Sequence, residues 1–223
     1  MNDKFDAAED KIAELGRQSD AAERKTVAPP YRFLNESITG IPRLAETLAK
    51  NWDAGKQQLF RGFLSAYFET FDRALAEQCL AAGEEADRTN GRDDIIFWRF
   101  LYTLHPGMKG FHWKGRSFES LSALGREMLD LLWRKDRSQN RYYRTILSEQ
   151  VLSAYAAIVV PEDKIFQETA ASVETSYRLE KPGRNSPIGT FYAMAYFLSG
   201  QKTLNVENRL FHTVEEFAGY MRE

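Results

Sequence analysis

Apolar residues recur at the same positions in three stretches of the chain. The stretches are 31–48, 111–128 and 204–221, and they align without a gap. In each stretch the first, third and eighth positions are apolar, and apolar residues then recur every three or four positions. Alternation of apolar and polar residues predicts a strand, whereas a period of three to four residues predicts a helix. Each stretch is therefore predicted to form a β-hairpin followed by a helix.

The fifth position of each stretch suits a tight hairpin turn. It holds Asn35, Gly115 or Asn208, and these residue types tolerate the positive φ of a two-residue type I′ turn. The predicted first strands are 31–33, 111–113 and 204–206. The predicted second strands end at Ile38, Phe118 and Phe211. A small residue on each following helix is expected to let that helix pack closely on its sheet; these residues are Ala45, Gly125 and Ala218.

The segments between the predicted hairpins also resemble one another. The segment 99–111 resembles 192–204, and the segment 60–68 resembles 143–151. Each hairpin and its helix are therefore expected to be followed by about three more helices before the next hairpin. The predicted fold class is mainly α (α+β), a tandem repeat of a small β-hairpin plus helices in about two and a half copies.

The predicted organisation has four parts. Residues 1–30 are polar, and their main large apolar residues form a narrow stripe on a predicted helix that Pro29 and Pro30 end. These stripe residues are Phe5, Ile12 and Leu15. The other predicted parts are repeat 1 over 31–110, repeat 2 over 111–203 and a partial repeat 3 over 204–223.

Composition restricts the classes of function. The chain has 223 residues, of which 43% are hydrophobic, so it can bury a substantial core. Its formal net charge of −2 does not favour non-specific binding to nucleic acid. The single cysteine, Cys79, cannot form an intrachain disulfide, and the first residues do not resemble a signal peptide. No apolar stretch is long enough to span a bilayer. We therefore expect a cytoplasmic protein that is not associated with a membrane.

The sequence lacks the common motifs for catalysis and cofactor binding. It has no phosphate-binding G-x-x-x-x-G-K-[ST], no G-x-G-x-x-G, no G-x-S-x-G, no H-E-x-x-H and no C-x-x-C. We therefore expect no catalytic residue, no cofactor and no metal ion. An enzyme with a dispersed site between repeats stays open as an alternative, and its contributors would be Asp93, Asp94, His105 and His112. The competing interpretation is that Asp93 caps a helix that begins near Asp94 and that the histidines lie at the surface or in caps.

One run combines basic and aromatic residues. It spans 134–144 and contains Arg134, Lys135, Arg137, Arg141, Tyr142, Tyr143 and Arg144. Such a combination can bind single-stranded nucleic acid, but it is equally typical of the solvated start of a helix. Because the chain as a whole is slightly acidic, we do not expect a nucleic-acid partner and keep this function as a second alternative.

Two arginines occupy the same position after the predicted turns. In a two-residue hairpin Arg116 lies opposite Trp113, and we expect its guanidinium to stack on that ring; otherwise these charges face a partner. The candidate partner-binding residues are Arg116, Arg209, Trp113, Phe5, Ile12 and Leu15. Eight other aromatic residues are expected to build the helical core: Trp52, Trp98, Trp133, Phe60, Phe63, Tyr67, Phe68 and Phe71.

Two segments carry a resemblance to known proteins. "LAETLAKNWDAGKQQLFRGFLSAYF" and "FWRFLYTLHPGMKGFHWKGRSFESLSALG" resemble an accessory helical repeat module of bacterial multidomain proteins, where it accompanies kinase-like, chaperone-like or other signalling domains. The resemblance covers most of residues 31–221 and includes no catalytic residue. It implies a bacterial cytosolic module that acts in cis or through protein partners. We therefore predict a non-enzymatic protein-interaction or scaffold module, as a fragment or accessory subunit of a larger assembly.

Overall fold

A computed structural model describes residues 28–134, 140–179, 188–200, 204–206, 209–211, 216 and 219–220. The chain consists of two compact units, Met1–Gly40 and Ile41–Glu223. None of the helices in the described part of the chain combines the length and the apolar character that crossing a bilayer requires.

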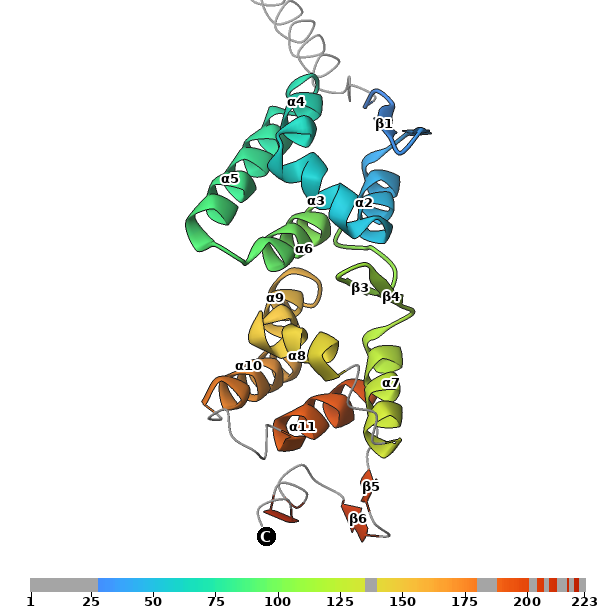
Figure 1. Cartoon of the computed structure of the whole chain (residues 1–223), viewed down its shortest axis with the longest axis vertical. Helices are drawn as coiled ribbons and strands as arrows, with labels where there is room; N and C mark the ends of the chain where they lie inside the picture. The colour runs from blue at the N-terminus through green and yellow to red at the C-terminus, as the bar shows by residue number, and fades with distance from the viewer. Residues whose placement is uncertain are drawn as a thin grey trace, which may run out of the picture. The chain divides into compact units, whose positions relative to one another are not determined.

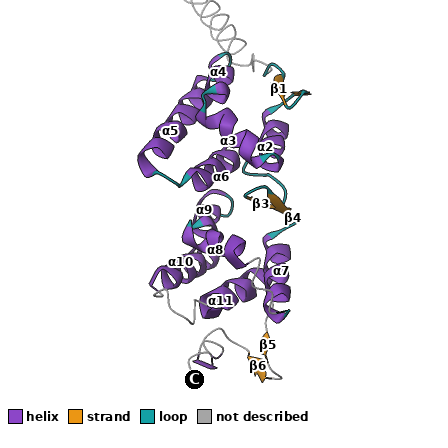
Figure 2. Cartoon of the chain, viewed as in Figure 1, coloured by secondary structure: helices purple, strands orange, loops and turns teal. Residues whose placement is uncertain are grey.

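The described residues form ten helices and three two-stranded antiparallel sheets, in a recurring order along the chain (Figures 1 and 2). The first hairpin is β1 (Tyr31–Phe33) and β2 (Glu36–Ile38). The five helices after it are α2 (Ile41–Lys50), α3 (Trp52–Phe60), α4 (Phe63–Glu69), α5 (Arg73–Thr89) and α6 (Asp93–Leu104). The second hairpin is β3 (Phe111–Trp113) and β4 (Arg116–Phe118). The next five helices are α7 (Leu121–Trp133), α8 (Asn140–Ser148), α9 (Val151–Ile158), α10 (Lys164–Leu179) and α11 (Ile188–Ser199). The third hairpin is β5 (Leu204–Val206) and β6 (Arg209–Phe211). The fold is therefore mainly α with small hairpins.

The hairpins have the predicted bounds and register. In the second hairpin Phe111 pairs with Phe118 and Trp113 pairs with Arg116, and the other two hairpins have the same register. Lys114 and Gly115 have φ values of 44° and 77°, and two successive positive φ values are what a type I′ turn requires. The first hairpin has the same pair of positive values at its turn. The third turn, with Asn208, lies outside the described residues.

The number of helices between hairpins differs from the prediction. Four helices, rather than about three, follow the helix after each of the first two hairpins. The reason is that a residue in the left-handed conformation separates α3 from α4 and α8 from α9. These residues are Gly62 (φ 79°) and Gln150 (φ 59°). A left-handed residue stops an α-helix because it turns the backbone out of the helical hydrogen-bonding path.

The structure corrects the alignment of 60–68 with 143–151. Gly62 and Gln150 each precede a helix that begins with one apolar residue and continues Leu-Ser-Ala-Tyr, so 64–67 corresponds to 152–155. The next helices in both groups have aspartate caps. Asp72 Oδ1 accepts from the N–H of the third residue of α5 at 3.1 Å, and Asp163 Oδ1 does the same for α10 at 2.9 Å. Such caps stabilise a helix start because they bind an N–H that has no partner within the helix.

Gly125 permits a close helix contact, but not the predicted one. A β-carbon at this position would lie 2.2 Å from the backbone nitrogen of Ser199 and 2.6 Å from the carbonyl carbon of Leu198. The small residue on α7 therefore lets this helix approach the end of α11 rather than its own sheet. Ser122 supports the contact, because its Oγ donates to the carbonyl oxygen of Ser199 at 3.1 Å. Ala218 lies outside the described residues.

The aromatic core is confirmed in part. Trp52, Trp98 and Phe68 are buried, and Trp98 stacks on Tyr102 with ring centroids 4.3 Å apart. Phe63 contradicts the prediction, because it is 53% exposed. It is the first residue of α4, whose buried face carries Leu64 and Phe68 instead. Three other predicted core residues are half-buried, namely Phe60, Tyr67 and Phe71, and the side chain of Trp133 lies outside the described part.

Candidate functional site

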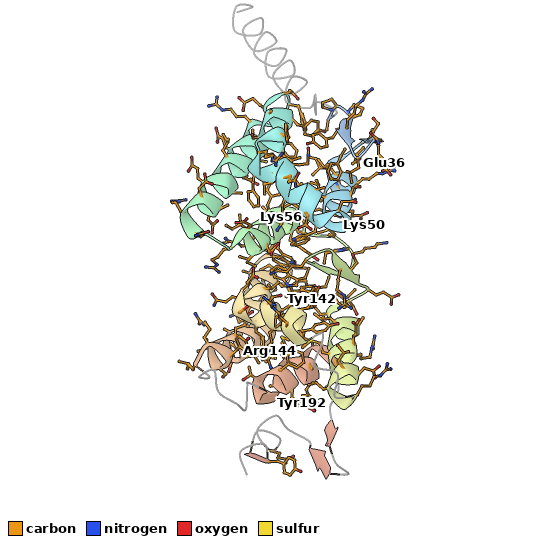
Figure 3. All side chains as sticks on the ribbon, in the orientation of Figure 1. Glu36, Lys50, Lys56, Tyr142, Arg144 and Tyr192 are labelled. Atoms are coloured by element: carbon orange, nitrogen blue, oxygen red, sulfur yellow. The ribbon has the colours of Figure 1, made fainter. Side chains whose placement is uncertain are left out.

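Four charged side chains meet beside the second hairpin. Lys114, in the β3–β4 turn, has its Nζ 3.0 Å from Asp94 Oδ2 on α6 and 2.7 Å from Glu149 Oε1 after α8. Lys56 on α3, labelled in Figure 3, has its Nζ 2.8 Å from Asp94 Oδ1. None of these side chains is more than 26% exposed. We call Lys56, Asp94, Lys114 and Glu149 the junction cluster, because they connect the helices before the hairpin with those after it.

Two indole rings enclose the junction cluster. Trp52 Nε1 donates to Asp94 Oδ1 at 2.7 Å, and the Trp52 ring lies edge-on to Trp113 at 5.8 Å. Trp113 is fully buried and its Nε1 donates to Thr145 Oγ1 on α8 at 2.8 Å. Lys114 is the cation over this ring, with Nζ 5.3 Å from the centroid. A partly desolvated cation over an indole face is attracted by the ring quadrupole.

Two groups of the junction cluster, Asp94 and Lys114, are held in their ionised forms. Burial by itself would raise the pKa of Asp94, but hydrogen bonds from two lysines and an indole hold it below its ordinary value. Burial would lower the pKa of Lys114, but hydrogen bonds to two carboxylates raise it. A general acid or base works best with a pKa near the operating pH. The cluster is therefore suited to holding the hairpin in place rather than to proton transfer at neutral pH.

Arg116 extends away from Trp113, and this corrects the prediction that it stacks there. Its guanidinium carbon lies 4.9 Å from the centroid of Tyr142 and 5.4 Å from that of Tyr143. Nη1 donates to the Tyr143 hydroxyl at 3.0 Å, and Nη2 pairs with Glu127 on α7. The physical reason is that Trp113 points into the core between α3 and α8. Arg116 therefore binds the hairpin to both α7 and α8.

The predicted partner-binding residues have different surroundings. Trp113 is fully buried. Arg116 is 36% exposed and bound to residues of its own chain. The side chain of Arg209 lies outside the described residues, as do Phe5, Ile12 and Leu15.

The basic and aromatic residues of 134–144 do not all face the solvent. Arg134 and Arg141 are exposed and Arg144 is half-buried. Tyr143 is buried, with its hydroxyl bound to Glu127, and Tyr142 donates its hydroxyl to the Trp113 carbonyl oxygen at 2.6 Å (Tyr142 and Arg144 are labelled in Figure 3). Stacking on a nucleobase requires an accessible ring face, and the Tyr143 ring offers none. Lys135 and Arg137 lie outside the described residues.

The two aspartates considered for catalysis have separate surroundings. Asp94 belongs to the junction cluster. Asp93 lines an open groove of about 370 Å³ together with Asp53, Lys56, Gln57, Phe60 and Arg61. The prediction that Asp93 is the N-cap is wrong: α6 begins at Asp93, and the preceding Arg92 makes no capping side-chain bond. Both carboxylates instead lie in the first turn, where they interact favourably with the helix dipole.

The two described histidines do not join these aspartates. His105 follows the last residue of α6. His112 on β3 is buried, which corrects the expectation of a surface or capping residue. Its Nε2 donates to the carbonyl oxygen of Lys109 at 2.9 Å, and its Nδ1 accepts from Ser117 Oγ at 2.8 Å. Burial lowers the pKa of His112, so its ring is neutral and both nitrogens are occupied. His212 lies outside the described residues.

A buried carboxylate on α10 was missed by sequence analysis. Glu174 is fully buried; its Oε1 accepts from the backbone nitrogens of Leu152 at 2.8 Å and Ser153 at 3.3 Å, and its Oε2 accepts from Ser153 Oγ. Burial raises the pKa of Glu174 to about 7, although these hydrogen bonds oppose the change. Both oxygens are occupied by the start of α9, so the group acts as a cap rather than as an acid or base. The available signal was its place on the face of α10 that carries Ala170 and Val173.

Neither a candidate metal site nor a reactive cysteine is found among the described residues. Within this part of the chain no three His, Cys, Asp or Glu side chains gather as a metal ion would require. Cys79 is buried, and burial raises the pKa of its thiol to about 12, so it is protonated and unreactive at neutral pH. Comparison with protein-family models, with curated proteins and with solved structures found no match to this chain.

Proposed function

We propose that this protein is a non-enzymatic protein-interaction or scaffold module built from tandem repeats of one hairpin and five helices. Three features support the repeat. The hairpins share one register, a left-handed residue precedes Leu-Ser-Ala-Tyr in both helix groups, and an aspartate caps the helix that follows. Stacked repeats present extended surfaces that suit binding to other proteins.

The junction cluster is the observation that carries the proposal. Lys114 pairs with a carboxylate from the helices before the hairpin and with one from the helices after it. The ring of Tyr155 on α9 lies 6.3 Å from Trp98 and 6.2 Å from Tyr102 on α6. Part-buried ion pairs and aromatic contacts thus join two helix groups. A rigid junction of this kind holds two binding surfaces in a constant relation, which is the physical requirement of a scaffold.

The proposal is tested by isolating partners and then rebinding them. The full chain and a chain lacking residues 1–30 would serve as affinity baits in the native host, and each recovered protein would be purified and titrated against the bait by calorimetry. We expect a stoichiometric protein partner that rebinds in purified form. A partner that both baits recover would place the interface on the helix groups. A partner that only the full chain recovers would place the interface on the N-terminal segment. Recovery of a nucleotide or metabolite without any protein partner would overturn the proposal in favour of an enzyme.

Lys114→Met is a sharper variant for the same titration. It removes the central charge of the junction, so a partner that spans both helix groups binds it more weakly than the unchanged chain. Arg134→Met is the matched control, because Arg134 directly follows α7 and forms an exposed pair with Asp130, four residues earlier. Equal affinities of the two variants and the unchanged chain would contradict a binding surface that depends on the junction.

A further inference from the structure

One face of α4 is the exposed counterpart of a face that is buried elsewhere in the chain. Helices α4 and α9 both follow a left-handed residue and share the sequence Leu-Ser-Ala-Tyr after their first residue. That first residue is Phe63 in α4, where it is 53% exposed, and Val151 in α9, where it is fully buried. One turn later Ala66 is exposed, whereas its counterpart Ala154 is half-buried. The larger apolar side chain is therefore on the less covered helix.

The covering of α9 shows what kind of element fits this face. Helices α6 and α9 are in contact and lie next to each other in Figure 1. Tyr155 of α9 packs on Trp98 and Tyr102 of α6, and also on Phe111 of β3 at 6.1 Å. One element that packs on α9 is thus an aromatic helix that directly precedes a hairpin, and it contacts Tyr155, one turn after Val151 on the same face of α9. The matching occupant for the face with Phe63 is another helix of that type.

Helix α11 has the position in its group that α6 has in the preceding one. It is the last of five helices and directly precedes a hairpin. Its sequence, IGTFYAMAYFLS, contains no charged residue, and a helix that is apolar on all sides is normally covered on all sides. Ala193 and Tyr196 nevertheless remain half-buried on adjoining turns. The same chain therefore carries an incompletely covered face of the α9 type and an incompletely covered helix of the α6 type.

We propose that two copies of this chain associate head to tail, with α11 of one copy packed on the α4 face that carries Phe63 in the next. The inference rests on the proposed repeat, because the internal contact of α6 with α9 is its template. The two surfaces differ, so the contact is heterologous, and a pair of copies still has one free surface of each type, one on each copy. Association can then continue beyond the dimer, into open chains or closed rings, and the mean mass grows with protein concentration.

Sedimentation velocity of the full chain and of two surface variants tests this geometry. Phe63→Asp places a charge in the proposed contact surface of α4, and Tyr196→Asp places a charge in the proposed contact surface of α11. We expect the mean mass of the unchanged chain to rise with concentration without levelling at a dimer, and each variant alone to remain monomeric. An equimolar mixture of the two variants retains one intact pair of surfaces, so it forms a dimer and nothing larger. Leu80→Asp is the control, because Leu80 is 54% exposed on α5 and belongs to neither proposed surface, so the association of this variant should match that of the unchanged chain.

Several results would overturn the inference. An unchanged chain that stays monomeric up to near-millimolar concentration would show that no second copy binds to the α4 face. A mixture of variants that does not dimerise, while each variant keeps the helical circular-dichroism spectrum of the unchanged chain, would exclude the pairing of these two faces. Recovery of a protein partner by a monomeric chain would overturn only this inference and leave the scaffold proposal in place. Self-association without any other protein partner would support this inference and overturn the scaffold proposal.

Discussion

The contact between Gly125 and the end of α11 provides a stringent test of the packing. In Gly125→Ala the new β-carbon would lie 2.2 Å from a backbone nitrogen and 2.6 Å from a carbonyl carbon, whereas favourable contacts between such atoms need about 3.5 Å. The helices must therefore separate locally by about 3.5 − 2.2 ≈ 1.3 Å. The obstructing atoms belong to the backbone of Ser199 and Leu198, so no side-chain rotation can relieve the overlap.

The expected change in the free energy of unfolding combines three contributions, two that destabilise the variant and one that stabilises it. Overpacking of a core costs about 1–3 kcal/mol, and separation of the helices also weakens the hydrogen bond from Ser122 to Ser199, worth about 1 kcal/mol. Alanine favours the helix interior over glycine by about 1 kcal/mol. Because the overlap is with backbone on a helix packed closely against α7, we expect the upper part of the range, a loss of about 2–3 kcal/mol in the free energy of unfolding.

Urea unfolding followed by circular dichroism measures this loss directly. Gly83→Ala on α5 is the matched control, because it also lies inside a helix but a β-carbon there meets nothing within 4 Å. The control is expected to gain about 0.5–1 kcal/mol from helix propensity alone. If Gly125→Ala proved as stable as Gly83→Ala, then α7 and α11 would not approach each other as described, and the packing argument would be refuted.

Three further predictions concern buried and paired groups. The folded-state pKa of Glu174 is raised from 4.5 to about 7. Its contribution to the free energy of unfolding is therefore complete below pH 4.5 and is lost as pH rises through about 7. Urea unfolding at pH 5 and pH 8 should show that Glu174→Gln removes up to about 3 kcal/mol of this pH dependence. Identical pH profiles would contradict a raised pKa. Lys114→Met should lower the free energy of unfolding by about 2 kcal/mol, because it leaves two partly buried carboxylates without their shared cation. Arg134→Met should change the free energy of unfolding by less than about 0.5 kcal/mol. Equal losses in the two variants would show that the junction cluster is no stronger than a surface pair. Cys79 should resist a thiol reagent at pH 8 in the native protein and react after denaturation, and rapid native labelling would disprove its burial.

The hairpins were predictable because their determinants are local. The turn at Lys114 and Gly115 needs two positive φ values, and the alternation of Phe111 and Trp113 sets the register over only a few residues. The apolar spacing after the turn likewise predicts a helix, and Leu124 and Met128 are indeed buried. The sequence gives no signal for the break at Gln150, because glutamine rarely adopts the left-handed conformation, whereas Gly62 does give such a signal. Without both breaks the predicted helix number and the predicted alignment were wrong.

The candidate site was much less predictable than the elements that hold it. Asp94 was noticed, but it was assigned beside a helix cap rather than to an ion-pair cluster, since its partners Lys56 and Lys114 are far from it in sequence. The sequence does not indicate the burial of Glu174, because a glutamate on a helix is ordinarily solvated. Phe63 was placed in the core from its spacing alone.

The sequence by itself determined the mainly helical class, the three hairpins and their register, since periodicity and turn chemistry act between residues a few positions apart. Only the tertiary structure decided which cation lies over Trp113, which helix Gly125 approaches, and that Phe63 is exposed at the start of α4 whereas Val151 is buried at the start of α9. These outcomes depend on neighbours from other elements. Because burial and ion pairing are properties of the assembled packing, the first residues of the similar helices α4 and α9 differ in exposure, and this difference is what makes the α4 face a candidate for binding a second copy.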